Sequence, residues 1–210
     1  MPDTKPAAPR GLVTLRAFLW IAVALVTIMG LIAWLGDGRH APPASVASRF
    51  GGPFALTAPD GTTISDKTLA GKPYAIFFGF TRCPDVCPTN LARMARLRQK
   101  LGADGMKFAI VFVSVDPGHD SRDGIGKYVA LFNTPIIGLT GTPAQLAGIQ
   151  KGFGVYVKRV PLDAAKPDGD YTIDHTAATY LMTADGTLQS IIAHEEADEM
   201  ALAKLKRLVG

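Results

Sequence analysis

Two uniformly apolar runs, separated by a stretch with helical periodicity, constrain the fold of this 210-residue chain most strongly. The runs cover residues 74–80 and 108–115. A strand with one face in water alternates apolar and polar residues, so these runs predict central strands that are buried on both faces. Between them, apolar residues recur at helical spacing over residues 88–101, and Gly102 follows as a helix end.

The remaining elements follow in an order that indicates the fold class. Pro59-Asp60-Gly61 predicts a turn in a small hairpin over residues 54–64, and Asp185-Gly186 predicts a second hairpin. The other expected elements are helices over residues 124–132, 142–153 and 197–209, a short strand over 136–139, a polar loop over 161–170, and hairpin strands over 178–182 and 188–192. This order is that of a thioredoxin-like α/β fold, so we expect one such domain over residues 50–210.

Residues 17–35 form an apolar stretch without charge or proline. At about 1.5 Å per helical residue, the stretch nearly spans a hydrocarbon core of about 30 Å. Trp20 and Trp34 lie near its ends, where amphipathic rings favour the membrane interface. A cleaved signal peptide is the alternative, with Ser45-Val46-Ala47 as its cleavage site. Because signal peptides are cut close behind a shorter apolar core, we expect an uncleaved transmembrane anchor.

Charge sets the expected orientation of that anchor. Lys5, Arg10 and Arg16 precede it, so the positive-inside rule predicts a cytoplasmic tail over residues 1–16. A linker rich in Gly, Pro and Ser over residues 36–49 would then lead to an exported domain. This arrangement fits a bacterial inner membrane, with the domain in the periplasm. Part of the net charge of +4 belongs to the N-terminal region, and the chain has no basic run that would indicate nucleic-acid binding.

The only two cysteines, Cys83 and Cys87, stand where the first buried strand is expected to lead into its helix. Unpaired N–H groups at a helix N-terminus stabilise a thiolate, so at least one thiol should have a lowered pKa. Such thiolates exchange disulfides or bind soft metals. A Cys-x-x-Cys pair would indicate exchange, but here three residues intervene, and Pro84 and Pro88 stiffen the segment. Two thiolates alone bind a metal incompletely, so the metal hypothesis needs a third ligand.

Histidines at four positions are the candidates for that ligand. His40 lies in the linker, and His194 lies in a polar segment where a solvated side chain is expected. His119 follows the second buried strand and stays open as an accessory. His175, beside Asp174, precedes the second hairpin, and in a thioredoxin-like sheet this position can face the end of the first strand. From the residues alone, a role as metal ligand and a structural role are equally plausible for His175.

Several motifs together resemble the Sco/SenC family of copper proteins. They are Phe80-Thr81-Arg82-Cys83-Pro84-Asp85-Val86-Cys87-Pro88, Val113-Ser114-Val115-Asp116-Pro117 with Asp120, Gly138-Leu139-Thr140-Gly141, and Asp174-His175-Thr176. The resemblance covers about the whole domain and implies one copper ion bound by Cys83, Cys87 and His175. It also implies a role in building the binuclear copper centre of cytochrome c oxidase, by delivering copper, by reducing the cysteines of that centre, or by both.

The donor set agrees chemically with this implication. Two thiolates and an imidazole form a soft set suited to Cu(I), and Cu(II) could be held by the same set with water or Asp174. Zinc accepts such ligands, but a structural zinc site normally has four and a catalytic site needs an activating carboxylate. Asp116 and Asp120 are candidates for hydrogen bonding to the ligands or for docking a partner protein. Loop turns explain aspartates at these positions equally well. We expect Asp85 to stay outside the coordination sphere.

The chain departs from the common family pattern without losing a ligand. Arg82, Thr89-Asn90 and Gly118-His119 stand where other residues are usual. A cation at Arg82 would favour a thiolate, so these differences bear on the potential of the site and on its partner surface.

The leading functional hypothesis is a membrane-tethered copper metallochaperone without enzymatic turnover. Its expected partners are the copper-centre subunit of the oxidase, a periplasmic copper donor and a thiol reductant. The alternative is a thiol-disulfide oxidoreductase in which Cys83 and Cys87 cycle and the histidine only tunes them. A peroxidase is weaker, because nothing beyond the thiols supports peroxide chemistry. A purely structural disulfide would close too short a loop to constrain the unfolded chain.

Overall fold

The computed structural model describes residues 10–36 and 50–210, and the chain divides into the units Met1–Ala41 and Pro42–Gly210. Helix α1 (Arg10–Gly36) covers the predicted apolar stretch, and its described apolar side chains are exposed. Among the described residues, no helix combines the length and the hydropathy needed to cross a membrane. Apart from Gly36, the expected linker lies outside the described residues.

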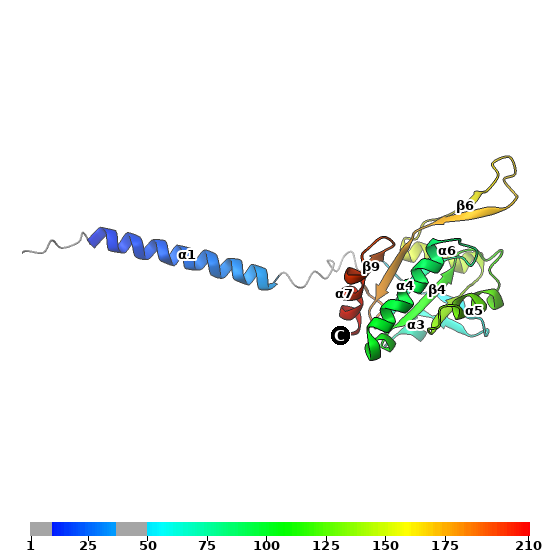
Figure 1. Ribbon diagram of the computed structural model, residues 1–210, viewed down its shortest axis with the longest axis horizontal. Helices are drawn as coiled ribbons and strands as arrows, with labels where there is room; N and C mark the ends of the chain where they lie inside the picture. The colour runs from blue at the N-terminus through cyan, green and yellow to red at the C-terminus, as the bar shows by residue number, and fades with distance from the viewer. Residues whose placement is uncertain (1–9, 37–49) are drawn as a thin grey trace, which may run out of the picture. The chain divides into compact units, whose positions relative to one another are not determined.

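The second unit is built on a five-stranded sheet with the strand order β5-β4-β3-β8-β9 (Figure 1). The two apolar runs form its centre, because β3 (Tyr74–Gly79) and β4 (Ala109–Ser114) are buried throughout and pair in parallel. The short strand β5 (Ile136–Leu139) extends the parallel part. The predicted hairpin is β8 (Ala178–Met182) with β9 (Leu188–Ala193), and β8 runs antiparallel to β3. This is the thioredoxin-like order that the sequence predicts.

Three helices cover one face of this sheet: α4 (Val86–Lys100), α5 (Arg122–Ala130) and α7 (Asp198–Val209). The ring of Phe112 on this face lies 5.4 Å from the ring of Tyr128 in α5. Helix α7 packs against α4 and against the β8–β9 hairpin. The face is therefore a continuous apolar layer, and the N-terminus of α4 lies where β3 ends.

The opposite face is covered by α6 (Pro143–Phe153), whose N-cap is Thr142 as predicted. Phe78 points to this face, because side chains alternate along a strand, and its ring lies 5.4 Å from that of Phe153. The predicted small hairpin, β1 (Ala55–Thr57) with β2 (Thr63–Ser65), packs against α6. Burial on both faces explains why the central strands show no polar alternation.

The predicted polar loop over residues 161–170 is observed, but two strands that the sequence does not predict flank it. β6 (Val157–Pro161) and β7 (Tyr171–His175) pair antiparallel and form a two-stranded sheet of their own. Most of their side chains are exposed or half-buried, and Ile173 is the one buried residue of the pair, so the two strands lack the apolar run that reveals a strand in a sequence. Two short helices, α3 (Asp66–Leu69) and η1 (Gly102–Met106), are likewise not evident from periodicity.

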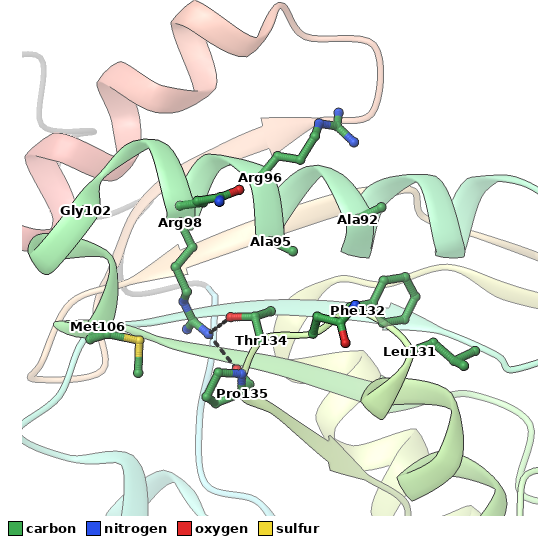
Figure 2. A pocket seen from close by; sticks show the side chains of 12 residues that line it. Ala92, Ala95, Arg96, Arg98, Gly102, Met106, Leu131, Phe132, Thr134 and Pro135 are labelled. Atoms are coloured by element: carbon green, nitrogen blue, oxygen red, sulfur yellow. Dashed lines mark hydrogen bonds between the residues drawn. The ribbon is translucent and has the colours of Figure 1, made fainter.

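Arg98 fixes the C-terminal end of α4 against the neighbouring strands. Its guanidinium donates hydrogen bonds to Thr134 Oγ1 at 3.0 Å, to the Pro135 carbonyl at 2.6 Å and to the Phe108 carbonyl at 2.8 Å. Figure 2 shows Arg98 among the residues that line a surface hollow of about 670 Å³. No cysteine or histidine lines this hollow, so it is separate from the metal-binding candidates.

Candidate metal centre

The two cysteines lie on either side of the start of α4. Strand β3 ends at Gly79, Cys83 stands in the connecting loop, and Cys87 is in the first turn of a helix that begins at Val86. The sequence suggests Pro88 as the first helical residue, but the helix starts two residues earlier. Pro88 is tolerated there because the N–H groups of a first helical turn have no partner within the helix.

The structure brings the three expected ligands together. One donor atom from each of Cys83, Cys87 and His175 lies within 4.8 Å of the other two. The backbone N–H of Cys87 donates to Cys83 Sγ at 3.3 Å, and Cys87 Sγ lies 3.5 Å from His175 Nε2. Both cysteines are free thiols, Cys87 buried and Cys83 half-buried. Two sulfurs and one nitrogen therefore face one another without a disulfide between them.

Strand direction explains how His175 reaches the cysteines. Because β8 is antiparallel to β3, the start of β8 lies beside the end of β3, and Thr179 pairs with Phe77. His175 ends β7 shortly before β8 begins. The expected approach of this histidine to the cysteine loop is thus observed, although the histidine belongs to a strand and not to a loop.

The imidazole of His175 is oriented by its neighbours. Its Nδ1 lies 3.2 Å from the Thr176 carbonyl oxygen, which can only accept, so this contact requires the hydrogen on Nδ1. In the neutral ring, Nε2, the nitrogen beside the sulfurs, then carries the lone pair that a metal would bind. The rings of Phe77 and Phe80 present edge contacts to the imidazole, with centroids 6.0 and 5.9 Å away.

The thiols differ strongly in acidity. The hydrogen bond from the Cys87 thiol lowers the pKa of Cys83 to about 4, assisted by His175 and the Cys87 N–H against the opposing effect of burial. The same hydrogen bond, with burial, raises the pKa of Cys87. At neutral pH the pair therefore holds one thiolate, on Cys83. The expected lowered pKa is present, but its main cause is the neighbouring thiol and not the helix N-terminus.

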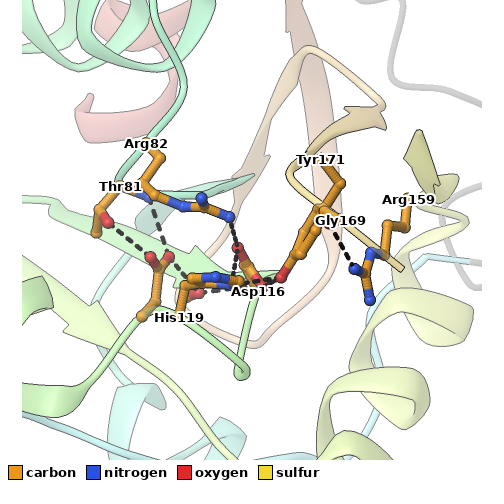
Figure 3. Close-up of polar contacts among 9 residues, drawn as sticks. Thr81, Arg82, Asp116, His119, Arg159, Gly169 and Tyr171 are labelled. Atoms are coloured by element: carbon orange, nitrogen blue, oxygen red, sulfur yellow. Dashed lines mark hydrogen bonds and ion pairs between the residues drawn. The ribbon is translucent and has the colours of Figure 1, made fainter. Parts of the chain in front are cut away.

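Two buried aspartates support the cysteine loop from the end of β4. Asp120 accepts hydrogen bonds from the Thr81 N–H at 3.0 Å, from Thr81 Oγ1 at 2.6 Å and from Ser114 Oγ at 2.6 Å. Asp116 accepts from Arg82 Nη2 at 3.3 Å (Figure 3). Both carboxylates thus hold residues just before Cys83, and neither belongs to the group of three donors.

The other polar candidates lie outside the donor group. Asp174 is exposed, and alternation along β7 turns it away from the face that carries His175. Asp85 is exposed and accepts a hydrogen bond from Thr89 Oγ1 at 3.0 Å. His119 contacts Asp116 and not the sulfurs. His194 is not in the group, and His40 lies outside the described residues.

Sequence reasoning misses two residues next to the candidate centre. Gly79 ends β3 directly beside the Cys87 sulfur, and Tyr171 hydrogen bonds to Asp116 from β7. The glycine at the end of an otherwise bulky apolar run is a signal of close approach. The tyrosine carries no comparable signal, because its strand is not evident from the sequence.

The fold and the donor group define a thioredoxin-like protein with a Cys-Cys-His set suited to a soft metal. Residues 42–210 match the model of the SCO1/SenC family. The chain belongs to this family.

Two curated relatives and one solved structure illustrate the similarity. Protein SenC of Rhodobacter capsulatus is 36% identical over 139 residues, which are 66% of this chain and 61% of that protein. The mitochondrial SCO1 homolog 1 of Arabidopsis thaliana is 36% identical over 142 residues, 67% of this chain and 41% of that protein. The copper-bound structure of Bradyrhizobium japonicum ScoI superposes with a TM-score of 0.68 at 43% identity, covering 76% of this chain and 99% of that one. The chain spans about half the length of the mitochondrial relatives it matches.

Proposed function

We propose that this protein is a copper metallochaperone that binds one copper ion through Cys83, Cys87 and His175. The observation that carries the proposal is the convergence of these three donors within 4.8 Å in a thioredoxin-like domain. The copper bound by the ScoI relative supports the choice of metal. A soft set of two sulfurs and one imidazole suits Cu(I), and water can complete the coordination of Cu(II).

The two cysteines have different roles in copper transfer. Cys83 is half-buried and already a thiolate, so it is the donor that an incoming carrier or acceptor reaches first. Cys87 is buried and protonated, and it must lose its proton as copper binds. Copper then leaves by ligand exchange with the thiolates of a partner. We propose that the acceptor is the copper-centre subunit of cytochrome c oxidase, as the family resemblance implies, with a periplasmic copper donor and a thiol reductant upstream.

A Cu(I) titration of the reduced full-length protein against a competing chelator tests the ligand set. We expect one Cu(I) per chain and a loss of Cu(I) affinity of about 10-fold or more in His175→Ala. Removing a ligand should lower the affinity at least as much as removing a residue that hydrogen bonds to a ligand. His194→Ala is the matched control, because it removes a histidine outside the donor group. Equal affinity of His175→Ala and the wild type would exclude His175 as a ligand.

A thiol-disulfide oxidoreductase is the second candidate, favoured by the lowered pKa of Cys83 beside a second thiol. Cys83 would attack a substrate disulfide, and Cys87 would then displace the reduced substrate, leaving a Cys83–Cys87 disulfide for an external thiol to reduce. Turnover on a protein disulfide without metal would support this function. Stoichiometric copper binding without such turnover would favour the metallochaperone.

We also propose that residues 17–35 anchor the protein in a bacterial inner membrane, with residues 1–16 in the cytoplasm, a linker over 36–49 and the domain of residues 50–210 in the periplasm. The proposal is supported by the uncharged apolar stretch, by the basic residues before it, and by the continuous helix α1. Alkaline extraction of membranes tests it. The full-length chain should stay with the lipid, and deletion of residues 17–35 should release it.

A further inference from the structure

The candidate ligands come from two parts of the fold that share no strand pairing. Cys83 and Cys87 follow β3 of the main sheet, whereas His175 belongs to β7, which pairs with β6 in a separate sheet. The β3–β8 pairing brings His175 to the end of β3, and the distance between the sulfurs and the imidazole depends in addition on contacts between β7 and the cysteine loop.

Asp116 connects these two parts (Figure 3). Its side chain is buried, Oδ1 accepts a hydrogen bond from the Tyr171 hydroxyl at 2.7 Å, and Oδ2 accepts from Arg82 Nη2 at 3.3 Å. Arg82 immediately precedes Cys83, and Tyr171 lies on the strand that ends at His175. One carboxylate is thus hydrogen bonded to both sides of the donor group.

Other contacts hold the Tyr171 side chain in place. The guanidinium of Arg159, on β6, stacks 3.7 Å from the centre of the Tyr171 ring, and that of Arg82 lies 5.1 Å away. His119 Nδ1 hydrogen bonds with the Tyr171 hydroxyl and lies 3.5 Å from Asp116 Oδ2. Cation–π and hydrogen-bond contacts together restrict the ring to one orientation.

Strand geometry transmits this restraint to the histidine. Side chains at alternate positions of a strand share a face, so Tyr171, Ile173 and His175 lie on the same face of β7. Ile173 is buried on that face. A strand held at Tyr171 and packed at Ile173 cannot turn or slide without moving the imidazole of His175.

We propose that Asp116 and Tyr171 are positioning residues, whose hydrogen bond sets His175 at coordination distance from Cys83 and Cys87. The inference rests on the proposed copper-binding function. It gives the buried Asp116 carboxylate a role that differs from simply completing a loop turn. If the carboxylate only stabilised its loop, loss of the Tyr171 hydroxyl would lower stability and leave the contribution of His175 to copper binding unchanged.

A double-mutant cycle on the full-length reduced protein separates these two roles, using a competing chelator for Cu(I). Tyr171→Phe keeps the ring and its stacking but removes the hydroxyl. We expect it to weaken Cu(I) binding about 10-fold when His175 is present, as is usual for groups that orient a ligand, and to have no effect in the His175→Ala background. The absorption of the Cu(II)–thiolate complex should change in Tyr171→Phe in the same direction as in His175→Ala.

Tyr156→Phe is the matched control, because this exposed tyrosine makes no side-chain hydrogen bond among the described residues. It should bind Cu(I) as the wild type does. Unchanged affinity in Tyr171→Phe, or an equal loss with and without His175, would overturn the positioning role. Equal Cu(I) affinity of the wild type and His175→Ala would instead refute His175 as a ligand. That comparison is independent of the comparisons that involve Tyr171→Phe.

Discussion

A Cβ atom on Gly79 would lie 2.7 Å from the sulfur of Cys87. It would also meet ring carbons of Phe77 and Phe112 at 3.0 Å, so neither the sulfur nor the rings leave room for a methyl group. Gly79→Ala should therefore move Cys87 or repack the aromatic layer, with a loss of about 1–3 kcal/mol in the free energy of unfolding and weaker Cu(I) binding. Urea unfolding and chelator competition measure the two effects.

Gly148→Ala is the control for that substitution. A Cβ there meets nothing within 4 Å, and the residue lies inside α6. The helix should gain up to about 1 kcal/mol, because alanine is the better helix former. If Gly79→Ala were as stable and bound Cu(I) as tightly as the wild type, the close contact between residue 79 and the Cys87 sulfur would be disproved.

The low pKa of Cys83 should depend on the thiol of Cys87. That thiol is the main cause of the shift to about 4, so Cys87→Ala should move the pKa of Cys83 up toward its ordinary value of 9.0. Cys87→Ser retains an O–H donor and should keep the pKa low. The pH dependence of iodoacetamide alkylation of the metal-free protein reports the thiolate. Identical profiles for the two variants would show that the donor hydrogen is not the cause.

The stability of the reduced, metal-free protein should depend on pH through the same pair. Between the lowered pKa of Cys83, about 4, and the ordinary value of 9.0, the unfolded state holds both thiol protons and the folded state only one. The contribution of this pair to the free energy of unfolding should therefore rise with pH across that window. The contribution should disappear as the pH falls through about 4.

Above the ordinary thiol pKa the sign reverses. The unfolded state then loses both protons, whereas the raised pKa of Cys87 keeps one proton in the folded state, so stability falls. Denaturant unfolding at a series of pH values, compared between the wild type and Cys83→Ser, isolates the contribution of the pair. The same pH profile for both proteins would contradict the assignment of the thiolate to Cys83.

Asp120 should stabilise the cysteine loop. Replacing it with alanine leaves the Thr81 N–H and the Thr81 and Ser114 hydroxyls without their acceptor, which should cost about 3 kcal/mol. Asp120→Asn keeps one acceptor oxygen, and the Thr81 hydroxyl can rotate to accept from the amide, so its loss should be about 1 kcal/mol. Chemical denaturation measures both variants. Equal losses would indicate that the negative charge, which both variants remove, and not the hydrogen bonds retained by asparagine, determines the cost.

Much of the fold and of the candidate centre is predictable from the sequence for identifiable reasons. The runs that became β3 and β4 are apolar on both faces, and Thr142-Pro143 and Asp185-Gly186 are strong local signals for a helix start and a turn. The strand order places the cysteine loop and the start of β8 at the same end of the sheet, which brings His175 near the cysteines.

The contacts that hold the centre together are not predictable in this way. The β6–β7 pair is largely exposed, with Ile173 as its one buried residue, so the strand that carries His175 has only a weak apolar signal in the sequence. The hydrogen bonds from Arg82 and Tyr171 to Asp116 connect residues that are far apart in the chain, and they depend on side-chain geometry alone. The main cause of the Cys83 pKa is likewise a specific side-chain contact.

The central claim is that Cys83, Cys87 and His175 together bind copper. X-ray absorption spectroscopy of the full-length protein loaded with one equivalent of Cu(I) tests this claim most directly. We predict two sulfur ligands and one imidazole nitrogen in the wild type, and loss of the imidazole signal in His175→Ala with both sulfurs retained. Coordination by sulfur alone in the wild type, or an imidazole signal that survives in His175→Ala, would contradict the account.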